Sequence, residues 1–511
     1  MSTRRASFVT VYHRAPYDED ALGDMSQLAE HASPNGIIPT LRAMFAEGRP
    51  GVWVAWTRSE LAGDPAFARD VTVGRNGNHI DVHRVALSAT EVDDFYHRFS
   101  KQALWPIICS SPANARFDEG QWRTFVDVNT RFADAVAGMA RPDATVWVHD
   151  YNLWLVPGLL RARMPAARIG FFHHTPFPGA DIFAILPWRD AILSSLLACD
   201  LVGFHIPHYA NSFAAAGANL VGAVATRTSP AAGGFRVSGT PLSAPTIVEE
   251  LEVGGRRTEL GAFPAGIDCA RIDAIRATPA HAARVDAIRR ELSDGQILLA
   301  VDRLDYVKGS VEKLIAYERL LEEQPRHRAT TTFVSIVTPP ADAISVHRSI
   351  RDEIDRLAGR VNGRFATLTW TPVRLFYRPL PFERIVSWYE AASVAWLSPL
   401  RDGLNLVAKE FVAAADGAPK VLVLSEFAGA HVQLEHAVTV NPYAPQSMAV
   451  ALRTALDMPP AARRLRMTAM NRIVRAEPPH RWASEFLDRL QRTNAGAGDR
   501  RPLIETGSAG P

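Results

Sequence analysis

Residues 297–321 read ILLAVDRLDYVKGSVEKLIAYERLL, and this stretch indicates the fold class of the chain. Its first five residues are a continuous apolar run of strand length. From Val311 onward, apolar residues recur every three or four positions, as they do on one face of a helix. A buried strand that passes through a short charged loop into an amphipathic helix is the repeating unit of a parallel α/β sheet.

The same pattern recurs on both sides of this stretch. Other apolar runs of strand length cover residues 7–12, 51–56, 144–149, 168–172, 201–205, 331–336, 394–398 and 421–425. Between the two sets, residues 221–266 are rich in Gly, Ala, Thr, Ser and Pro, which predicts hairpins and loops. We therefore predict two doubly wound α/β domains that face each other across a cleft, with a boundary near residues 270–285. Ligands are expected at the carboxyl ends of the strands.

Composition excludes several classes of function. The 511 residues are 47% hydrophobic and 22% charged, with a formal net charge of +2, so no broad field favours nucleic acid or a membrane surface. The cysteines Cys109, Cys199 and Cys269 are far apart, which predicts neither a disulfide framework nor a zinc site. No apolar run reaches the roughly 18 residues of a membrane span, and the N-terminus lacks a signal-peptide pattern. We expect a cytoplasmic protein.

Two cations occupy the loop that follows residues 297–301. Arg303 and Lys308 precede the predicted helix, for which Ser310 is a candidate N-cap. Together with the positive end of the helix dipole, they are suited to bind a diphosphate. Alternatively, this is a surface loop in which both cations pair with Asp302 and Asp305.

A second loop, PLRDGLNLVAKEF (399–411), follows the run at 394–398. Gly403 permits a close backbone approach at a helix start. Glu410, about two turns into that helix, is suited to accept hydrogen bonds from ribose hydroxyls. The alternative is a capped helix whose Asp402, Lys409 and Glu410 face solvent.

Polar groups also end two strands of the first half. Asp150 follows the run at 144–149, and His174 follows the run at 168–172, so both are expected at one edge of the sheet. Asp150 is suited to orient or deprotonate an acceptor hydroxyl, and His174 to bind a sugar hydroxyl. His173 beside it is more readily a structural histidine. No third ligand at metal spacing accompanies the pair, so we do not predict a metal site.

Phosphate-binding features lie nearer the N-terminus. Arg14 ends the first strand, and SPNGIIPT (33–40) leads through Gly36 into a helix. Tyr96 and Trp105 suit a small polyol or sugar phosphate at a cleft. The alternatives are a tight turn at Gly36 and two core aromatics.

Four segments together resemble the retaining glycosyltransferase family that contains trehalose-phosphate synthase, family 20. They read YHRAPYDE (12–19), SPNGIIPT (33–40), WVHDYNLWL (147–155) and FFHHTPFP (171–178). The resemblance runs from about residue 7 to residue 490. Within the family it is greatest to the members that glucosylate sn-glycerol 3-phosphate.

The resemblance implies a GT-B fold, two Rossmann-like domains with the active site between them, and no metal ion or other cofactor. Its expected parts are an acceptor-binding domain (1–275), a nucleotide-sugar-binding domain (276–475), a C-terminal helix that crosses back (476–493) and a disordered tail (494–511).

The resemblance also implies roles for individual residues. On the donor side, Arg303 and Lys308 would bind the diphosphate and Glu410 the ribose, while Gly36, Asp402, Gly403, Leu404, Asn405 and Leu406 would lie near the donor sugar and phosphate. On the acceptor side, Asp150 would contact the reacting hydroxyl, and Arg14, Tyr96 and Trp105 would hold the phosphate. His174 would contact the glucosyl hydroxyls, and Asp150, His174, Arg303 and Lys308 form the catalytic set.

Two departures from trehalose-phosphate synthase concern the acceptor. That enzyme has Gly-Gly-Leu where this chain has Asn-Gly-Ile (35–37), and a phosphate-binding Ser-Arg-Gly-Asp where this chain has Pro-Pro-Ala-Asp (339–342). The second acceptor arginine is therefore missing, which favours an acceptor shorter than glucose 6-phosphate.

The expected reaction moves glucose from ADP-glucose to sn-glycerol 3-phosphate, giving 2-O-(α-D-glucosyl)-sn-glycerol 3-phosphate for compatible-solute synthesis. UDP-glucose and GDP-glucose stay open as donors. The alternatives are a trehalose-6-phosphate synthase that uses UDP- or ADP-glucose and glucose 6-phosphate, and a catalytically silent sugar-phosphate-binding regulator. No phosphatase-like segment is evident, so a separate phosphatase is expected downstream, and the residues leave a homo-oligomer open.

Overall fold

The computed structural model describes residues 5–17, 37–46, 51–59, 67–75, 78–235, 239–292, 295–339 and 345–493. Gly36 with residues 33–35, residues 340–342 and the predicted tail at 494–511 lie outside the described residues.

The first half of the chain forms a mixed sheet whose centre is parallel. Within the described residues it has ten strands, in the order β3-β4-β2-β1-β5-β6-β7-β10-β9-β8. The parallel centre is made of β1 (Ala6–Val11), β2 (Val52–Arg58), β5 (Ala140–His149), β6 (Arg168–His173) and β7 (Leu201–Phe204). Each of these strands begins within a few residues of a predicted apolar run, except β5, which begins earlier.

At both edges of this sheet the outermost strands pair antiparallel. One edge is the hairpin of β3 (Asp70–Arg75) and β4 (Asn78–Leu87), which the sequence did not predict. At the other edge, β8 (Val224–Pro230), β9 (Thr246–Val253) and β10 (Arg256–Ala262) form hairpins, which confirms the prediction for 221–266. The helices of this half are α1 (Ile37–Ala46), α2 (Ala89–Val92), α3 (Trp105–Ile108), α4 (Glu119–Met139), α5 (Val156–Arg163), α6 (Ala180–Phe183), α7 (Arg189–Leu196) and α8 (Pro207–Val221), with a π-helical stretch at Asp93–Leu104.

The second half forms a six-stranded, fully parallel sheet within the described residues, in the order β13-β12-β11-β14-β15-β16. Its strands are β11 (Gln296–Arg303), β12 (Thr331–Thr338), β13 (Val373–Phe376), β14 (Val394–Leu397), β15 (Val421–Ser425) and β16 (Val438–Val440). Every residue of β14 and β15 is buried, as expected for parallel strands covered by helices on both faces. The helices are α9 (Cys269–Arg276), α10 (Pro279–Glu291), α11 (Ser310–Glu323), α12 (Ser345–Phe365), α13 (Phe382–Ala391), α14 (Leu406–Ala415), α15 (Pro445–Asp457), α16 (Pro460–Arg475) and α17 (Pro479–Arg492).

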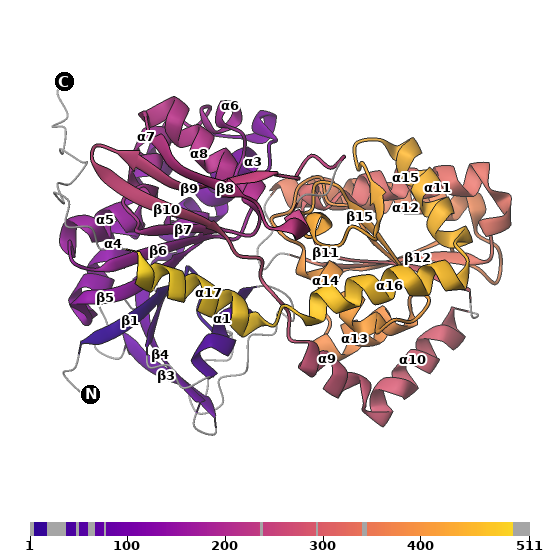
Figure 1. Cartoon of the computed structure of the whole chain (residues 1–511). Coiled ribbons are helices and arrows are strands. Elements are labelled where there is room, and N and C mark those ends of the chain that lie inside the picture. The colour runs from indigo at the N-terminus through magenta and orange to yellow at the C-terminus, as the bar shows by residue number, and fades with distance from the viewer. Residues whose placement is uncertain are drawn as a thin grey trace.

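The chain passes between the halves twice, and the two passages lie side by side (Figure 1). Helix α9 packs against α13 and α14, so the first passage lies between Ala262 and Cys269, a few residues before the predicted boundary. After α16, helix α17 returns to pack against α1, β6 and β7 of the first half. A β-carbon at Gly266, in the first passage, would stand 1.8 Å from the carbonyl oxygen of Glu477 in the second.

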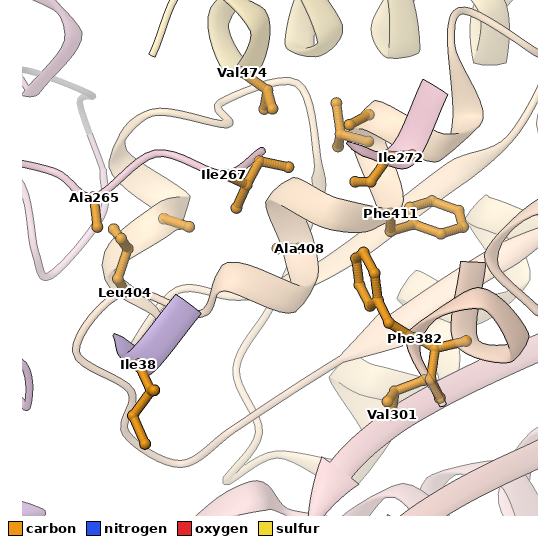
Figure 2. Packing of buried hydrophobic residues seen from close by; sticks show 14 of the residues in the cluster. Ile38, Ala265, Ile267, Ile272, Val301, Phe382, Leu404, Ala408, Phe411 and Val474 are labelled. Carbon is orange, nitrogen blue, oxygen red and sulfur yellow. The ribbon is translucent and has the colours of Figure 1, made fainter. Parts of the chain in front are cut away.

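One apolar core spans the two halves. Ile38 of α1 and Ala265 and Ile267 of the first passage belong to the same cluster as Leu404 and Ala408 of the second half (Figure 2). Their burial against one another fixes how the ends of the two sheets meet. No helix in the described ranges combines the length and apolar character needed to span a bilayer.

Candidate active site

The predicted site residues come from loops that follow strands of both sheets. In the first half they lie just after β1, β5 and β6, and in the second half at the end of β11 and just after β14. Because the carboxyl ends of parallel strands share one edge of a sheet, each set gathers at one edge. The shared core brings these two edges together.

Backbone contacts join the two edges directly. A β-carbon at Gly403 would stand 2.3 Å from the carbonyl oxygen of His174, so only glycine lets this loop approach so closely. Nearby, the hydroxyl of Tyr209 on α8 donates to the carbonyl of Asp402 at 3.0 Å. The loop after β14 is therefore held against the loop after β6.

Lys308 pairs with Asp402 across the second half. Its Nζ donates to Asp402 Oδ2 at 2.6 Å, and both side chains are largely buried. Burial by itself would lower the pKa of Lys308, but Asp402 holds it above its usual value. The amide of Asn405 also donates to Asp402 Oδ2, at 3.1 Å, so this carboxylate is fixed between two donors.

The alternative of a simple surface loop is wrong for Lys308. Asp302, its supposed partner, pairs instead with the buried Lys313 at 2.6 Å. Asp305 accepts from the backbone N–H of Val307 at 3.2 Å and from the indole N–H of Trp105 at 3.4 Å. The second of these bonds ties the loop to the first half.

The predicted N-cap at Ser310 is also wrong. Gly309 occupies the cap with a left-handed φ of 65°, and Ser310 is the first helical residue of α11. A glycine can adopt this conformation without the penalty that a β-carbon would bring. A β-carbon there would also stand 2.4 Å from the carbonyl oxygen of Ser398, so two loops of the second half touch at this point.

Arg303 lies at the junction of the two halves. Its side chain is exposed at the end of β11, and no carboxylate of the described residues forms an ion pair with it. Its charge nevertheless helps to lower the pKa of Tyr96, and it acts against the raised pKa values of Tyr12 and Asp150 in the first half and of Lys308 in the second. Arg303 therefore contributes positive charge to both edges.

Asp150 has an unusual backbone and a perturbed carboxyl. Its φ of 69° and ψ of 164° lie in a region that only glycine adopts readily, and such strain is often found at functional sites. Burial raises its pKa to about 6, although backbone N–H groups of Tyr151 and His174 and the charges of Lys101 and Arg303 act in the opposite direction. Its Oδ1 has no partner among the described residues. The carboxyl is thus placed to accept a ligand hydroxyl.

His174 is held by a second histidine. Its Nε2 lies 3.1 Å from Nδ1 of His149, and burial lowers the pKa of both rings, so both are neutral at pH 7. Nδ1 of His174 is buried and has no partner in the described part of the chain. His173 follows the structural alternative: its Nδ1 bonds the carbonyl of Thr175 at 2.9 Å, between the rings of Trp154 and Phe204.

The residues that follow Asp402 are not solvent-facing. Asn405 caps α14 by accepting from the N–H of Ala408 at 3.0 Å, and Leu404 is buried in the shared core, so its main chain alone is available to a ligand. Leu406 is the first residue of α14 and packs against the same core.

Glu410 lies just over one turn into α14, not two. It is buried and accepts from the hydroxyl of Tyr389 at 2.8 Å. Burial raises its pKa to about 7, while Tyr389 and Arg271 lower it. Lys409 is buried too, which contradicts the alternative of an exposed charged helix.

The predicted acceptor residues are gathered around one phenol. Arg14 Nη2 donates to the hydroxyl of Tyr96 at 2.6 Å. Burial would raise the pKa of Tyr96, but Arg14, Lys101 and Arg303 lower it to about 8. Three cations therefore converge on a single neutral group, which is the electrostatic character of an anion site.

Sequence reasoning missed Lys101, His149 and Tyr151. A usable signal existed for each: Lys101 lies between Tyr96 and Trp105 in one helical stretch, and His149 and Tyr151 flank Asp150. What the sequence did not show was that their side chains face the site.

Comparison with known proteins assigns most of the chain to one protein family. The family model described as Glycosyltransferase family 20 matches residues 6–492. Glucosylglycerol-phosphate synthase from Synechocystis sp. is 43% identical over 482 residues, which are 94% of this chain and 97% of the relative. The resemblance inferred from four segments is thereby confirmed.

Solved structures of trehalose-6-phosphate synthases share the fold. The E. coli protein bound with UDP-2-fluoro glucose has a TM-score of 0.81 and 29% identity, over 95% of this chain and 99% of its own. An α,α-trehalose-phosphate synthase (UDP-forming) from Burkholderia xenovorans, in complex with glucose 6-phosphate, gives the same values. The predicted GT-B fold is confirmed.

Proposed function

The chain belongs to glycosyltransferase family 20 and is a glycosyltransferase, and from this premise we propose that it transfers glucose from ADP-glucose to sn-glycerol 3-phosphate. The product would be 2-O-(α-D-glucosyl)-sn-glycerol 3-phosphate, formed with retention of the anomeric configuration. The observation that carries the proposal is that cations from both halves, Arg14 and Arg303, both act on Tyr96, and that Arg303 also acts on the perturbed carboxyl of Asp150, while neither forms an ion pair with a carboxylate of the described residues.

The donor diphosphate is proposed to lie at Arg303 and Lys308. Breaking the glycosidic bond leaves extra negative charge on the departing phosphate, and cations already fixed there stabilise that charge more than the ground state. Asp402 holds Lys308 in place before the donor arrives. The buried Glu410 of α14 is proposed to bind the ribose.

The acceptor is proposed to bind on the side of the first half. Its reacting hydroxyl would donate to Oδ1 of Asp150, the unpaired oxygen, while Arg14, Tyr96 and Trp105 hold its phosphate. Nδ1 of the neutral His174, which has no partner among the described residues, would bond a hydroxyl of the transferred glucose. No protein nucleophile is assigned: the leaving phosphate would help to deprotonate the acceptor.

We propose glycerol 3-phosphate rather than glucose 6-phosphate as the acceptor for two reasons. The Synechocystis relative, which matches along almost its whole length, is a glucosylglycerol-phosphate synthase. In addition, Pro-Pro-Ala-Asp at 339–342 lacks the arginine with which trehalose-phosphate synthases bind the acceptor phosphate. Because the cations of the protein neutralise the leaving group, we also propose that the reaction needs no metal ion, so activity should survive EDTA.

A two-by-two assay tests the proposal. Purified protein is given ADP-glucose or UDP-glucose with sn-glycerol 3-phosphate or glucose 6-phosphate, nucleoside diphosphate release is measured, and the product is identified by NMR. We expect the fastest release with ADP-glucose and glycerol 3-phosphate, and an α-linked product. Faster release with glucose 6-phosphate would replace the proposal by trehalose-6-phosphate synthesis. Tight binding of substrates with no release in any combination would indicate a regulator.

A further inference from the structure

Lys101 sits in an aromatic cage beside the proposed acceptor site. It lies on the π-helical stretch Asp93–Leu104, and its Nζ donates to the hydroxyl of Tyr151 at 3.0 Å. The same Nζ lies 4.9 Å from the ring centroid of Trp105, 5.4 Å from that of Tyr96 and 5.7 Å from that of Tyr151. Ring faces attract an ammonium and restrict its movement, so this cation is held in one place.

No carboxylate in the described ranges neutralises Lys101. The same is true of Arg14, whose contacts are the hydroxyl and ring of Tyr96. By contrast, Arg98 on the same helical stretch pairs with Asp93 at 2.8 Å and is half exposed. Within the described residues these two partly buried cations share the phenol of Tyr96 and form no ion pair with a carboxylate, so both charges would stabilise an anion bound between them.

Both cations contact Tyr96, and their charges act on the same neighbouring groups. Arg14 and Lys101 both lower the pKa of Tyr96, which settles at about 8, and both lower the pKa of His13, whose ring stacks on Tyr96. Charges from two chain segments therefore add to the positive potential at Tyr96: Arg14 after β1 and Lys101 before α3.

We propose that Lys101 is the second cation that binds the phosphate of the acceptor, in place of the arginine missing from residues 339–342. The inference rests on the proposed function. A phosphate monoester carries a charge of about −1.5 to −2 at pH 7, which Arg14 and Lys101 together neutralise. Lys101 is bonded to Tyr151, the residue next to Asp150, so a phosphate bound there would lie on the side of the site where the reacting hydroxyl is proposed to meet Asp150.

The test compares Lys101→Met with Lys101→Arg and with the control Arg98→Met. Methionine keeps an unbranched apolar chain for the aromatic cage and removes the charge together with the hydrogen bond to Tyr151. For Lys101→Met we expect KM for glycerol 3-phosphate to rise about 10- to 100-fold, as the loss of one charged hydrogen bond predicts, with KM for the nucleotide sugar unchanged. Lys101→Arg should recover much of the loss, and Arg98→Met should behave like the wild type.

Binding measurements separate this inference from the proposed function. Calorimetry with glycerol 3-phosphate, glucose 6-phosphate and glycerol needs no turnover. The role is supported if Lys101→Met, but not Arg98→Met, binds the two phosphate esters more weakly while its binding of glycerol is unchanged. This holds even if the acceptor turns out to be glucose 6-phosphate. Unchanged binding of both esters by Lys101→Met, or no binding of either ester by the wild type, overturns it. Equal losses for the acceptor and the nucleotide sugar also overturn it, because they indicate general damage to the fold.

Discussion

Gly403 faces the carbonyl of His174 so closely that a β-carbon at residue 403 would come within 2.3 Å of its oxygen. The two residues belong to different halves of the molecule. Gly403 is not among the glycines with positive φ, so the requirement is one of space rather than of backbone conformation. This contact sets how near the loop after β14 comes to Asp150 and His174.

Gly403→Ala should therefore separate the two edges of the site. Because the neighbouring atoms are backbone, the loop must move, and a displacement of about 1 Å near the chemistry costs on the order of 100-fold in kcat/KM. The matched control is Gly359→Ala in α12, where nothing lies within 4 Å of the added carbon. It should keep full activity and raise the free energy of unfolding by up to about 1 kcal/mol, since alanine favours helix. Equal activity of the two variants would contradict this.

Arg303→Ala and Lys308→Ala should each lower kcat/KM. The loss should correspond to about 2–4 kcal/mol of transition-state stabilisation, as the removal of one preorganised donor does. The control is Arg319→Ala on the exposed face of α11, where the arginine pairs with Glu323. Steady-state diphosphate release checks the result. If neither Arg303→Ala nor Lys308→Ala lowers activity, these cations do not stabilise the leaving group as proposed.

The pH profile should report the carboxyl of Asp150. Burial raises its pKa to about 6, and the group acts as an acceptor only when ionised, so kcat/KM should fall below about pH 6. Asp150→Asn should lose this acidic limb along with most of the activity. Glu410, whose pKa is about 7, is the competing candidate, and Glu410→Gln should leave the limb at pH 6 in place.

Stability should change with pH in the opposite direction to activity. Because the folded pKa of Asp150 lies above its unfolded value, the native state binds more protons, and this contribution to stability is lost as the pH rises from about 4 to about 6. Urea unfolding at pH 4 and pH 8 measures the effect. Asp150→Asn should be stabilised relative to the wild type at pH 8 more than at pH 4.

The two passages between the halves are joined through the buried Lys409 of α14, which forms an ion pair with the partly buried Glu477. Lys409 Nζ donates to the carbonyl of Ala265 at 2.8 Å and to Glu477 Oε2 at 2.9 Å, and Gln433 donates to the other oxygen of Glu477 at 2.7 Å. Glu477→Ala leaves the ammonium unpaired and should lower the free energy of unfolding by about 3 kcal/mol.

The double variant Lys409→Met with Glu477→Leu should recover most of this loss, because it removes both charges together. Chemical denaturation of the single and double variants measures the coupling. A double variant as unstable as the sum of its parts would show that the pair is not the source of the stability.

The sequence by itself determined the central strands of both sheets and the positions of the loops that carry Asp150, His174, Arg303, Lys308 and Asp402. Continuous apolar runs and helical spacing are local patterns, so they can be recognised without knowing where the chain goes next. Short or polar strands escaped this approach: β16 has three residues, and β3 begins with Asp70.

Only the tertiary structure decided which side chains meet. The pairing of Lys308 with Asp402, the bond between His149 and His174, and the placement of Lys101 against Tyr151 join residues 94, 25 and 50 positions apart. Such contacts depend on strand order and on the two passages between the halves, and these are set by burial of apolar surface over the whole chain rather than by any local pattern. For the same reason, the raised pKa of Asp150 and the contact of Gly403 with His174 follow from burial between two halves that no single stretch of sequence contains.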